Sequence, residues 1–507
     1  MKKSFSFFAL LAAAAVGAAV IPPTPAAATS GTTPAVLVER LTGPNLPNDT
    51  VGRFSVGATD LGVLWNNGAG ETLAAFGDTY DGAWLSHAND GHNGADWRSN
   101  VLLRSTDTDL SDGMRFTSAA TDVAGHAKQI IPSQHGGTIA DGRWEETTIP
   151  TAGVSVGTRQ YLSYMSVRSW DFPGEWATNY ARIAYSDDNG NTWDSTSGPT
   201  WDNGTTDLSG FQMHALVRDG GYVYMFGTPS GRFGSVRLAR VPEAQVLVKS
   251  AYTYWTGSTW STSESAAVAL FTGQVSEMSV IHDTVAGRWV MMYASANEDI
   301  VLRTASSPTA TWSAPQTVVT TADYPWVYGP FLHPSSSGGE LYFTISQWHP
   351  YNVYLMKVRL NAAGTVTSPN LIADPSFERD TIGTTWSCMG GCGLDEKTWG
   401  LTGINNAWIA AVTGWTDIHQ SVTVAPYTNY TLTAWVRTSA NSTAGYFGVR
   451  SSTAIVSEIP YGPSTGWKRL VVRFNSGSST SLQAFAGLWG VTTDTWAQID
   501  DVTLTKD

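Results

Sequence analysis

The strongest constraint on the fold is a series of five paired apolar segments that runs through the first two thirds of the chain. Each pair encloses a turn rich in Gly, Asn or Asp, which is the sequence pattern of a β-hairpin. With 50 Gly and only 14% charged residues, the 507-residue chain predicts an all-β protein without long helices. The pairs are residues 54–65 with 72–80, 148–156 with 161–167, 211–217 with 222–227, 278–282 with 289–293, and 328–333 with 341–346.

Each hairpin is followed by an outer segment with a Ser/Thr-rich turn and an aromatic residue. The clearest one spans residues 186–193 and matches the Asp-box pattern S-x-D-x-G-x-T-W, in which Asp188 and Gly190 shape a turn and Trp193 packs between blades. Five such four-stranded units arranged radially make a five-bladed β-propeller. We expect a strand near Val36 to close the ring by joining the last blade. A large β-sandwich is the alternative fold.

The chain divides into several parts. Residues 1–28 have Lys2 and Lys3, a short apolar run and an Ala-rich end, which is typical of a signal peptide and predicts secretion. Residues 29–50 are expected to form a tether, 51–363 the propeller and 364–369 a linker. Alternating strands over residues 370–507 predict a β-sandwich of the jelly-roll kind. No later segment is long and apolar enough to span a membrane.

Charge and cysteine content restrict the partners. The net charge of −13 argues against a polyanionic partner such as nucleic acid and leaves neutral partners such as sugars open. Cys388 and Cys392 are the only cysteines and are expected to form a small disulfide loop. His87, His92, His126 and His135 lack metal-ligand spacing, so we assign no catalytic metal. We expect a monomer.

The mouth of the propeller channel is the expected site, because the ends of the inner strands meet there. The sequence places carboxylates, aromatic rings and hydrogen-bonding groups at this mouth, a composition that suits a neutral sugar. These residues are Asp60, Asp78, Thr151, Trp170, Gln212, His214, Arg232, Glu277, Tyr328 and Trp348.

Asp60 and Asp78 are the predicted acid/base pair. The turn between their strands centres near Gly68, so Asp60 is expected to face Gly77 or Asp78, with Cβ atoms about 4.5–5.5 Å apart. Two carboxyl groups at this separation titrate differently and can serve as one acid and one base in glycoside hydrolysis. The plain alternative is that such Asp residues only cap turns. Glu277 is a third candidate, as an acid, a modulator of pKa or a ligand of sugar hydroxyls.

Several motifs occur in an order that resembles a family of secreted five-bladed propellers once catalogued as a domain of unknown function and linked to endo-D-arabinanases. The motifs span residues 59–62, 76–79, 97–100, 186–193, 226–232, 276–279 and 348–352. The resemblance implies endo cleavage of the α-linked D-arabinofuranosyl chains of mycobacterial arabinogalactan and lipoarabinomannan, without a cofactor. It implies Asp60 as base and Asp78 as acid, with the reverse assignment left open, an inverting reaction, and Asn352 among the substrate-binding residues.

The C-terminal part resembles the carbohydrate-binding jelly-rolls appended to secreted glycanases. The resemblance implies a possible structural Ca²⁺ held by Glu378 and Asp501. It also offers Trp399, Trp408, Trp415 and Trp489 as sugar platforms, although core packing is the alternative for some of them.

Two other functions stay open at this point. One is a non-catalytic propeller that binds sugar through the same carboxylates. The other is a sialidase-like exo-glycosidase, suggested by the Asp-box; it requires an arginine cluster, and no pattern unites Arg98, Arg232 and Arg303.

Overall fold

The first part of the chain forms five separate antiparallel sheets, each built around one of the expected hairpins. The computed structural model describes residues 33–83, 96–171, 174–205, 209–367, 370–396, 400–411, 413–490 and 495–507. The expected signal peptide lies outside the described residues, as do His87, His92 and Trp399. Within the described ranges, no helix has the length and apolar character that a membrane span needs.

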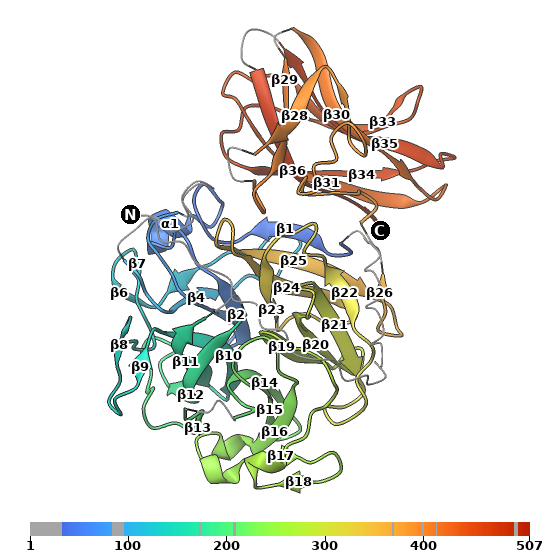
Figure 1. Ribbon diagram of the computed structural model, residues 1–507. Helices are drawn as coiled ribbons and strands as arrows, with labels where there is room; N and C mark the ends of the chain where they lie inside the picture. The colour runs from blue at the N-terminus through green and yellow to red at the C-terminus, as the bar shows by residue number, and fades with distance from the viewer. Residues whose placement is uncertain are drawn as a thin grey trace, which may run out of the picture. The chain divides into compact units, whose positions relative to one another are not determined.

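The sheets follow one another along the chain, and each is a blade whose strands are neighbours in sequence (Figure 1). Blade 1 contains β2(Leu61–Asn66), β3(Thr72–Phe76), β4(Val101–Ser105) and β5(Ser118–Ala119). Blade 2 contains β10(Thr147–Val156), β11(Arg159–Trp170), β12(Trp176–Ser186) and β13(Thr200–Asp202). Blade 3 contains β14(Met213–Asp219), β15(Tyr222–Thr228), β16(Arg237–Pro242), β17(Thr253–Trp255) and β18(Trp260–Ser261). Blade 4 contains β19(Met278–Asp283), β20(Arg288–Ala294), β21(Ile300–Ala305) and β22(Gln316–Val319).

Blade 5 closes the ring with a strand from the other end of the propeller. It contains β23(Val327–Leu332), β24(Glu340–Gln347) and β25(Asn352–Leu360), with the short β26(Val366–Thr367) paired to β25. The N-terminal strand β1(Val36–Arg40) pairs antiparallel with β25, so that Val36 lies opposite Lys357. The innermost strands contact each other in the order β2, β10, β14, β19, β23, and β23 returns to contact β2. The five-bladed β-propeller and its closing strand are therefore confirmed.

Short elements occupy the connections between these strands. The helix α1(Thr50–Phe54) begins after Asp49, whose side chain accepts a hydrogen bond from the backbone N–H of Gly52. The first hairpin starts at Leu61 of β2, later than the residue 54 expected from the sequence, since α1 ends at Phe54 and residues 55–60 are irregular. The other short elements are η1(Glu243–Gln245), η2(Lys249–Ala251), η3(Glu264–Ala266), β6(Thr121–Val123), β7(His126–Ala127), β8(Gly137–Thr138) and β9(Trp144–Glu145).

The Asp-box after β12 forms the predicted turn. Asp188 accepts hydrogen bonds from the backbone N–H and the hydroxyl of Thr192, and the Trp193 indole donates to the carbonyl of Gly190. A Cβ on Gly190 would lie 2.3 Å from Leu102 of blade 1, so only glycine fits there. The Asp-box therefore joins blade 2 to blade 1.

The C-terminal part is a sandwich of two five-stranded antiparallel sheets, as expected. One sheet has the order β27(Ser387–Met389), β30(Gly414–Thr423), β35(Ser481–Gly490), β32(Gly445–Arg450), β33(Ile455–Tyr461). The other has the order β28(Gly391–Asp395), β29(Asn406–Ala411), β36(Thr495–Lys506), β31(Asn429–Thr438), β34(Lys468–Asn475). Alternate residues such as Ile409, Ile418, Leu432 and Leu504 form the buried core between them. A disulfide between Cys388 and Cys392 confirms the predicted loop and links β27 to β28.

Candidate active site

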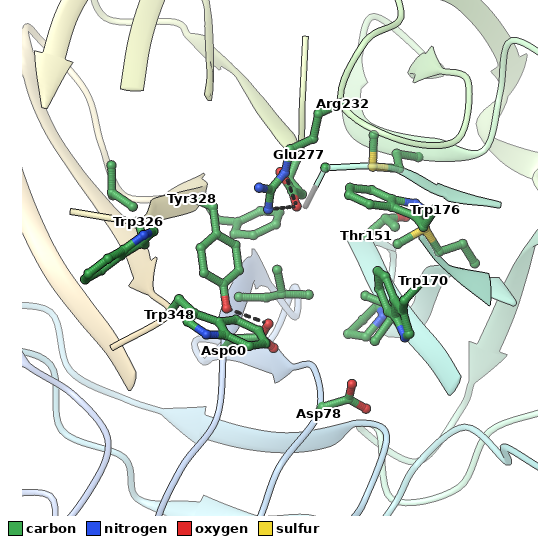
Figure 2. A pocket seen from close by; sticks show the side chains of 18 of the residues that line it. Asp60, Asp78, Thr151, Trp170, Trp176, Arg232, Glu277, Trp326, Tyr328 and Trp348 are labelled. Atoms are coloured by element: carbon green, nitrogen blue, oxygen red, sulfur yellow. Dashed lines mark hydrogen bonds and ion pairs between the residues drawn. The ribbon is translucent and has the colours of Figure 1, made fainter. Parts of the chain in front are cut away.

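A cavity of about 880 Å³ is lined by residues from all five blades. This volume lies within the range of small-molecule and oligosaccharide sites, roughly 300–1,000 Å³. The cavity brings together nine of the ten residues that the sequence placed at the mouth, all except Gln212: Asp60, Asp78, Thr151, Trp170, His214, Arg232, Glu277, Tyr328 and Trp348. Figure 2 shows most of these side chains converging on one space.

The hairpin of β2 and β3 brings the two aspartates of blade 1 together. Leu61 lies opposite Phe76, and the backbone N–H of Gly77 donates to the carbonyl of Asp60, so Asp60 faces Gly77 with Asp78 next to it. This is the register that the sequence predicted. A Cβ on Gly77 would lie only 2.3 Å from Oδ1 of Asp60, so the glycine leaves room for the carboxyl group.

The carboxyl group of Asp60 has a strongly raised pKa. Burial is the main cause, the nearby charge of Asp78 adds to it, and the pKa rises to about 8. The hydroxyl of Tyr328 donates a 2.9 Å hydrogen bond to Oδ2 of Asp60 and opposes the shift, as does the Tyr351 hydroxyl. At pH 7 Asp60 is therefore mainly protonated.

Asp78 lies in a different environment and keeps a lower pKa. Burial raises its pKa to about 6, while hydrogen bonds from two donors hold it down. The Trp97 indole and the Thr147 hydroxyl each donate to Oδ1 of Asp78 at 2.8 Å. The pair thus has one protonated and one ionised member near neutral pH, in the order opposite to the expected roles of Asp60 as base and Asp78 as acid.

A charged pair faces the aspartates from blades 3 and 4. Arg232 binds Glu277 through two nitrogens, with NH2 at 2.9 Å from Oε1 and Nε at 3.2 Å from Oε2. The guanidinium also lies over the rings of Tyr328 and Trp176, 5.2 and 5.6 Å from their centroids. Among the described residues that line the cavity, Arg232 is the only Arg or Lys. Glu277 therefore neutralises the one strong cation of the site.

Large aromatic rings flank the aspartates on two sides. Trp170 of blade 2 is 51% exposed, and Trp326 and Trp348 of blade 5 are 45% and 46% exposed. Figure 2 shows Trp170 on one side of the cavity and Trp326 and Trp348 on the other, with Asp60 and Asp78 between them. Half-exposed indole faces at a cavity wall are suited to stacking on sugar rings rather than to core packing.

Some of the strained backbone positions of the chain lie at this cavity. Leu61, Trp326 and Tyr351 line it and have positive φ angles of 65°, 55° and 58°. Such angles are costly for residues other than glycine, at about 1–3 kcal/mol each, and cluster at functional sites. Leu61 directly follows Asp60, so this backbone turn helps to direct the Asp60 side chain into the cavity.

Two expected substrate ligands do not line the cavity. The buried side chain of Gln212 accepts a hydrogen bond from the Thr178 hydroxyl and donates to the carbonyl of Trp201. Asn352 is also buried, and its side chain bonds the Thr42 hydroxyl and the carbonyl of Pro350. Both side-chain amides thus form hydrogen bonds with other parts of the protein. This corrects their assignment as substrate-binding residues.

His214 reaches the cavity wall but is held as a structural residue. Its ring nitrogens contact the Ser163 hydroxyl at 2.7 Å and the carbonyl of Phe211 at 3.1 Å. Burial lowers the pKa of His214 to about 3, so the ring is neutral. In the part of the chain that the structure describes, no group of three or more His, Cys, Asp or Glu is arranged to hold a metal ion.

Several residues of the site were missed at the sequence level. Trp97 and Thr147 hold Asp78, and Trp176 covers Arg232. Glu298 adds a further carboxylate to the wall. Of these only Trp97 carried a signal, because it belongs to one of the ordered motifs.

The acidic residues expected to bind Ca²⁺ in the sandwich are already hydrogen-bonded. Oε1 of Glu378 accepts from the backbone N–H groups of Ile404 and Asn405, and Oδ2 of Asp501 accepts from the Thr402 hydroxyl. These oxygens thus serve as hydrogen-bond acceptors within the sandwich. The Ca²⁺ site that the resemblance implies stays a prediction.

The tryptophans expected to bind sugar in the sandwich differ in exposure. Trp489 is half-exposed and lies 5.6 Å from the ring of Trp415, whereas the Trp408 indole is partly buried and donates to the carbonyl of Leu394. Trp415 and Trp489 therefore remain candidates for stacking on a sugar ring.

The fold and the cavity define a five-bladed propeller with an acidic, aromatic-lined central site. Residues 45–357 match the family described as a domain of unknown function (DUF4185), and the chain belongs to this family. Notoamide biosynthesis cluster protein J of Aspergillus sp. (strain MF297-2) is 35% identical over 314 residues, 58% of this chain and 81% of that protein. Notoamide biosynthesis cluster protein J' of Aspergillus versicolor is 34% identical over 337 residues, 63% of this chain and 88% of that protein.

Solved structures resemble the chain only in outline. An exo-β-1,3-galactanase from Phanerochaete chrysosporium, solved with β-1,3-galactotriose, shares 10% identity with a TM-score of 0.43 and covers 92% of this chain and 99% of its own. At this TM-score and identity the likeness carries no conclusion about activity.

Proposed function

We propose that the propeller is an endo-acting glycoside hydrolase that cleaves α-linked D-arabinofuranosyl chains, with Asp60 and Asp78 as its acid/base pair. The observation that carries the proposal is that two buried carboxyl groups with separated pKa values, about 8 and about 6, face one open cavity lined with aromatic rings. Glycoside hydrolysis needs such a pair, since one group donates a proton while the other accepts one.

The order of the pKa values supports the following roles. Protonated Asp60 gives its proton to the glycosidic oxygen as the bond to the anomeric carbon breaks. Ionised Asp78 takes a proton from a water molecule, whose oxygen forms the new bond to that carbon. The reaction consumes one water and leaves Asp60 ionised and Asp78 protonated, and proton exchange with solvent restores both. We propose inversion, since the attacking water comes from the face opposite the leaving group.

Blade order supports cleavage within a chain. Blade 1 carries both aspartates and lies between blade 5, with Trp326 and Trp348, and blade 2, with Trp170. Sugar rings can therefore stack on both sides of the bond to be cut, which is what an endo-acting enzyme requires.

The charges of the site favour a neutral polymer over a sialoside. A sialidase needs a group of free arginines for the substrate carboxylate, whereas the one Arg or Lys among the described lining residues, Arg232, is engaged by Glu277. The choice of D-arabinan rests on the family resemblance of the ordered motifs. A non-catalytic sugar-binding propeller is the second candidate, in which the two aspartates only hydrogen-bond sugar hydroxyls.

The test is incubation of the full chain with mycobacterial arabinogalactan, followed by sizing of the products. We expect short D-arabinose oligomers from the start of the reaction, and NMR of the first-formed product should show the inverted anomer. Free arabinose alone would indicate an exo enzyme, a retained anomer would refute inversion, and intact polymer would refute the hydrolase. A branched L-arabinan of plant origin serves as the control substrate and should stay intact.

The remaining parts of the proposal concern the cell and the second domain. We propose that the protein is secreted as a monomer after loss of residues 1–28, and that the sandwich binds the same polysaccharide and raises its local concentration at the propeller. Fractionation of culture medium tests the first point. Sedimentation of the protein with insoluble arabinogalactan tests the second.

A further inference from the structure

A continuous line of side-chain contacts crosses the cavity from blade 4 to blade 1. Glu277, just before β19, holds the guanidinium of Arg232, which follows β15. Arg232 lies 5.2 Å over the ring of Tyr328 on β23, and the Tyr328 hydroxyl donates to Asp60 in front of β2. The dashed contacts in Figure 2 mark the two ends of this line. Four blades thus contribute to the surroundings of a single carboxyl group.

The packing leaves these four residues little freedom to move. Tyr328 is buried, and the Arg232 guanidinium is enclosed between its ring and that of Trp176. The backbone N–H of Arg232 donates to the carbonyl of Gly174, which fixes the start of the side chain. A change at Arg232 or Glu277 therefore reaches Asp60 both through the position of Tyr328 and through the electric field.

The charged and titratable groups that face Asp60 come from four blades. Asp78 and Tyr80 belong to blade 1, Tyr328 and Tyr351 to blade 5, Glu277 to blade 4 and Arg232 to blade 3. Apart from Arg232, each of these groups is neutral or negative near pH 7. Asp78 raises the pKa of Asp60 more than Glu277 does, and the balance between Arg232 and Glu277 adds a second charge contribution.

We propose that Arg232 and Glu277 are positioning residues that act on Asp60 through Tyr328, and that their mutual neutralisation sets the pH range in which Asp60 carries its proton. This inference rests on the proposed role of Asp60 as the acid for its effect on catalysis. Its effect on the protonation of Asp60 is independent of that role.

The two halves of the pair have opposite effects when removed singly. Arg232→Met leaves the Glu277 carboxylate unbalanced, and the added negative charge disfavours ionised Asp60. Glu277→Gln leaves the Arg232 cation unbalanced and favours ionised Asp60. Both variants break the same ion pair. A purely structural role of the pair therefore predicts that the pKa of Asp60 shifts in the same direction in both variants.

The first measurement is the pH dependence of kcat/KM on a D-arabinan oligosaccharide. We expect the basic limb of the profile to move up by about one pH unit in Arg232→Met and down by about one unit in Glu277→Gln. The double variant should return close to the wild type. Tyr328→Phe should move the limb upward, because it removes the donor that stabilises ionised Asp60. Arg232→Lys keeps the charge and should shift the limb least.

The second measurement does not depend on activity. Carbon-13 NMR of carboxyl-labelled aspartate gives the titration of Asp60 in the full chain, with Asp60→Asn to identify its signal. Opposite shifts in the two variants support the inference even if the wild type leaves D-arabinan intact, an outcome that refutes only the proposed function. Equal shifts, or none, in correctly folded variants overturn the inference. If Arg232→Met does not fold, the test uses Arg232→Lys and Glu277→Gln. A fall in the pKa of Asp60 that is larger in Glu277→Gln than in Arg232→Lys supports the proposal. The absence of such a fall overturns it.

Discussion

Buried carboxyl groups gather at two places, and the comparison separates a reactive site from a structural one. In the propeller, burial raises the pKa of Asp60 and of Asp78 to about 8 and about 6. In the sandwich, burial likewise raises the pKa of Glu378 to about 8 and of Asp501 to about 7. The values are alike, so a raised pKa by itself does not identify a catalytic group.

The difference lies in what surrounds each carboxyl group. Asp60 and Asp78 face a cavity with half-exposed indole rings, where a substrate can reach them. Glu378 accepts hydrogen bonds from two backbone N–H groups, and Asp500 accepts them from Leu401 and Thr402. The sandwich acids hold a loop in place, whereas the propeller acids line a cavity that a substrate can enter. The two regions therefore differ in whether a substrate can reach the carboxyl groups, and not in the pKa values of these groups.

The largest expected effect is the loss of catalysis when a propeller aspartate is neutralised. Asp60→Asn and Asp78→Asn should each lower kcat on D-arabinan by about 10²–10⁴-fold, because each removes one proton transfer. Glu378→Gln neutralises an equally buried carboxyl group in the sandwich and should leave kcat unchanged.

An aryl arabinofuranoside with a good leaving group sharpens this prediction. It needs little protonation, so Asp60→Asn should regain much of its rate on this substrate while Asp78→Asn stays inactive. Rescue of Asp78→Asn instead would restore the assignment of Asp60 as base. Near wild-type rates for both variants would show that the propeller does not use these residues for hydrolysis.

A smaller loss is expected from a methyl group placed beside Asp60. In Gly77→Ala the new Cβ would lie 2.3 Å from Oδ1 of Asp60, so the carboxyl group must move. Displacement of a catalytic group by about 1 Å costs roughly 10²-fold in rate. The measurement is kcat together with Tm. Gly462→Ala in the sandwich, where no atom lies within 4 Å of the new Cβ, is the matched control and should change neither.

The smallest effect concerns the stability of the sandwich. The raised pKa of Glu378, about 8 in the folded protein, means that the folded state binds a proton that the unfolded state releases between about pH 4 and pH 8. The free energy of unfolding should therefore increase as pH falls through this window. This added stability should disappear as pH rises toward 8. Glu378→Gln should reduce this slope by up to about 1.4 kcal/mol per pH unit.

Urea unfolding at several pH values measures this slope. Glu458→Gln, at an exposed position of β33, is the control and should leave the slope unchanged. A chelator should leave Tm unaltered, since the carboxylates of the sandwich already have hydrogen-bond donors. A clear fall in Tm with chelator, restored by Ca²⁺, would contradict this and support a bound Ca²⁺.

The sequence predicted the fold well because a hairpin pairs two segments that are adjacent in the sequence. Apolar pairs around Gly-, Asn- and Asp-rich turns located all five inner hairpins, and the same logic placed Asp60 opposite Gly77. The start of the first hairpin was wrong, since residues 55–60 form an irregular segment between α1 and β2. Thr147 and Trp176 escaped prediction because each reaches the site from a segment distant in sequence from the side chain it contacts. Trp97 belongs to one of the ordered motifs, but its contact with Asp78 was not predicted.

Gln212 and Asn352 show where strand-end reasoning fails. Gln212 directly precedes β14 and Asn352 is the first residue of β25, and along a strand successive side chains point to opposite faces. Their amides turn inward to satisfy backbone and hydroxyl groups, because a buried polar group needs a partner. Only the register of the neighbouring blades decides which side chain of such a pair faces the cavity.

The sequence alone therefore determined the number of blades, the closing strand, the disulfide loop and the pairing of two aspartates across one turn, since each depends on short-range patterns. The tertiary structure decided which aspartate keeps its proton, which cation is neutralised and which carboxylates a substrate can reach. These properties depend on burial and on charges from several blades, and such fields exist only after the ring has closed.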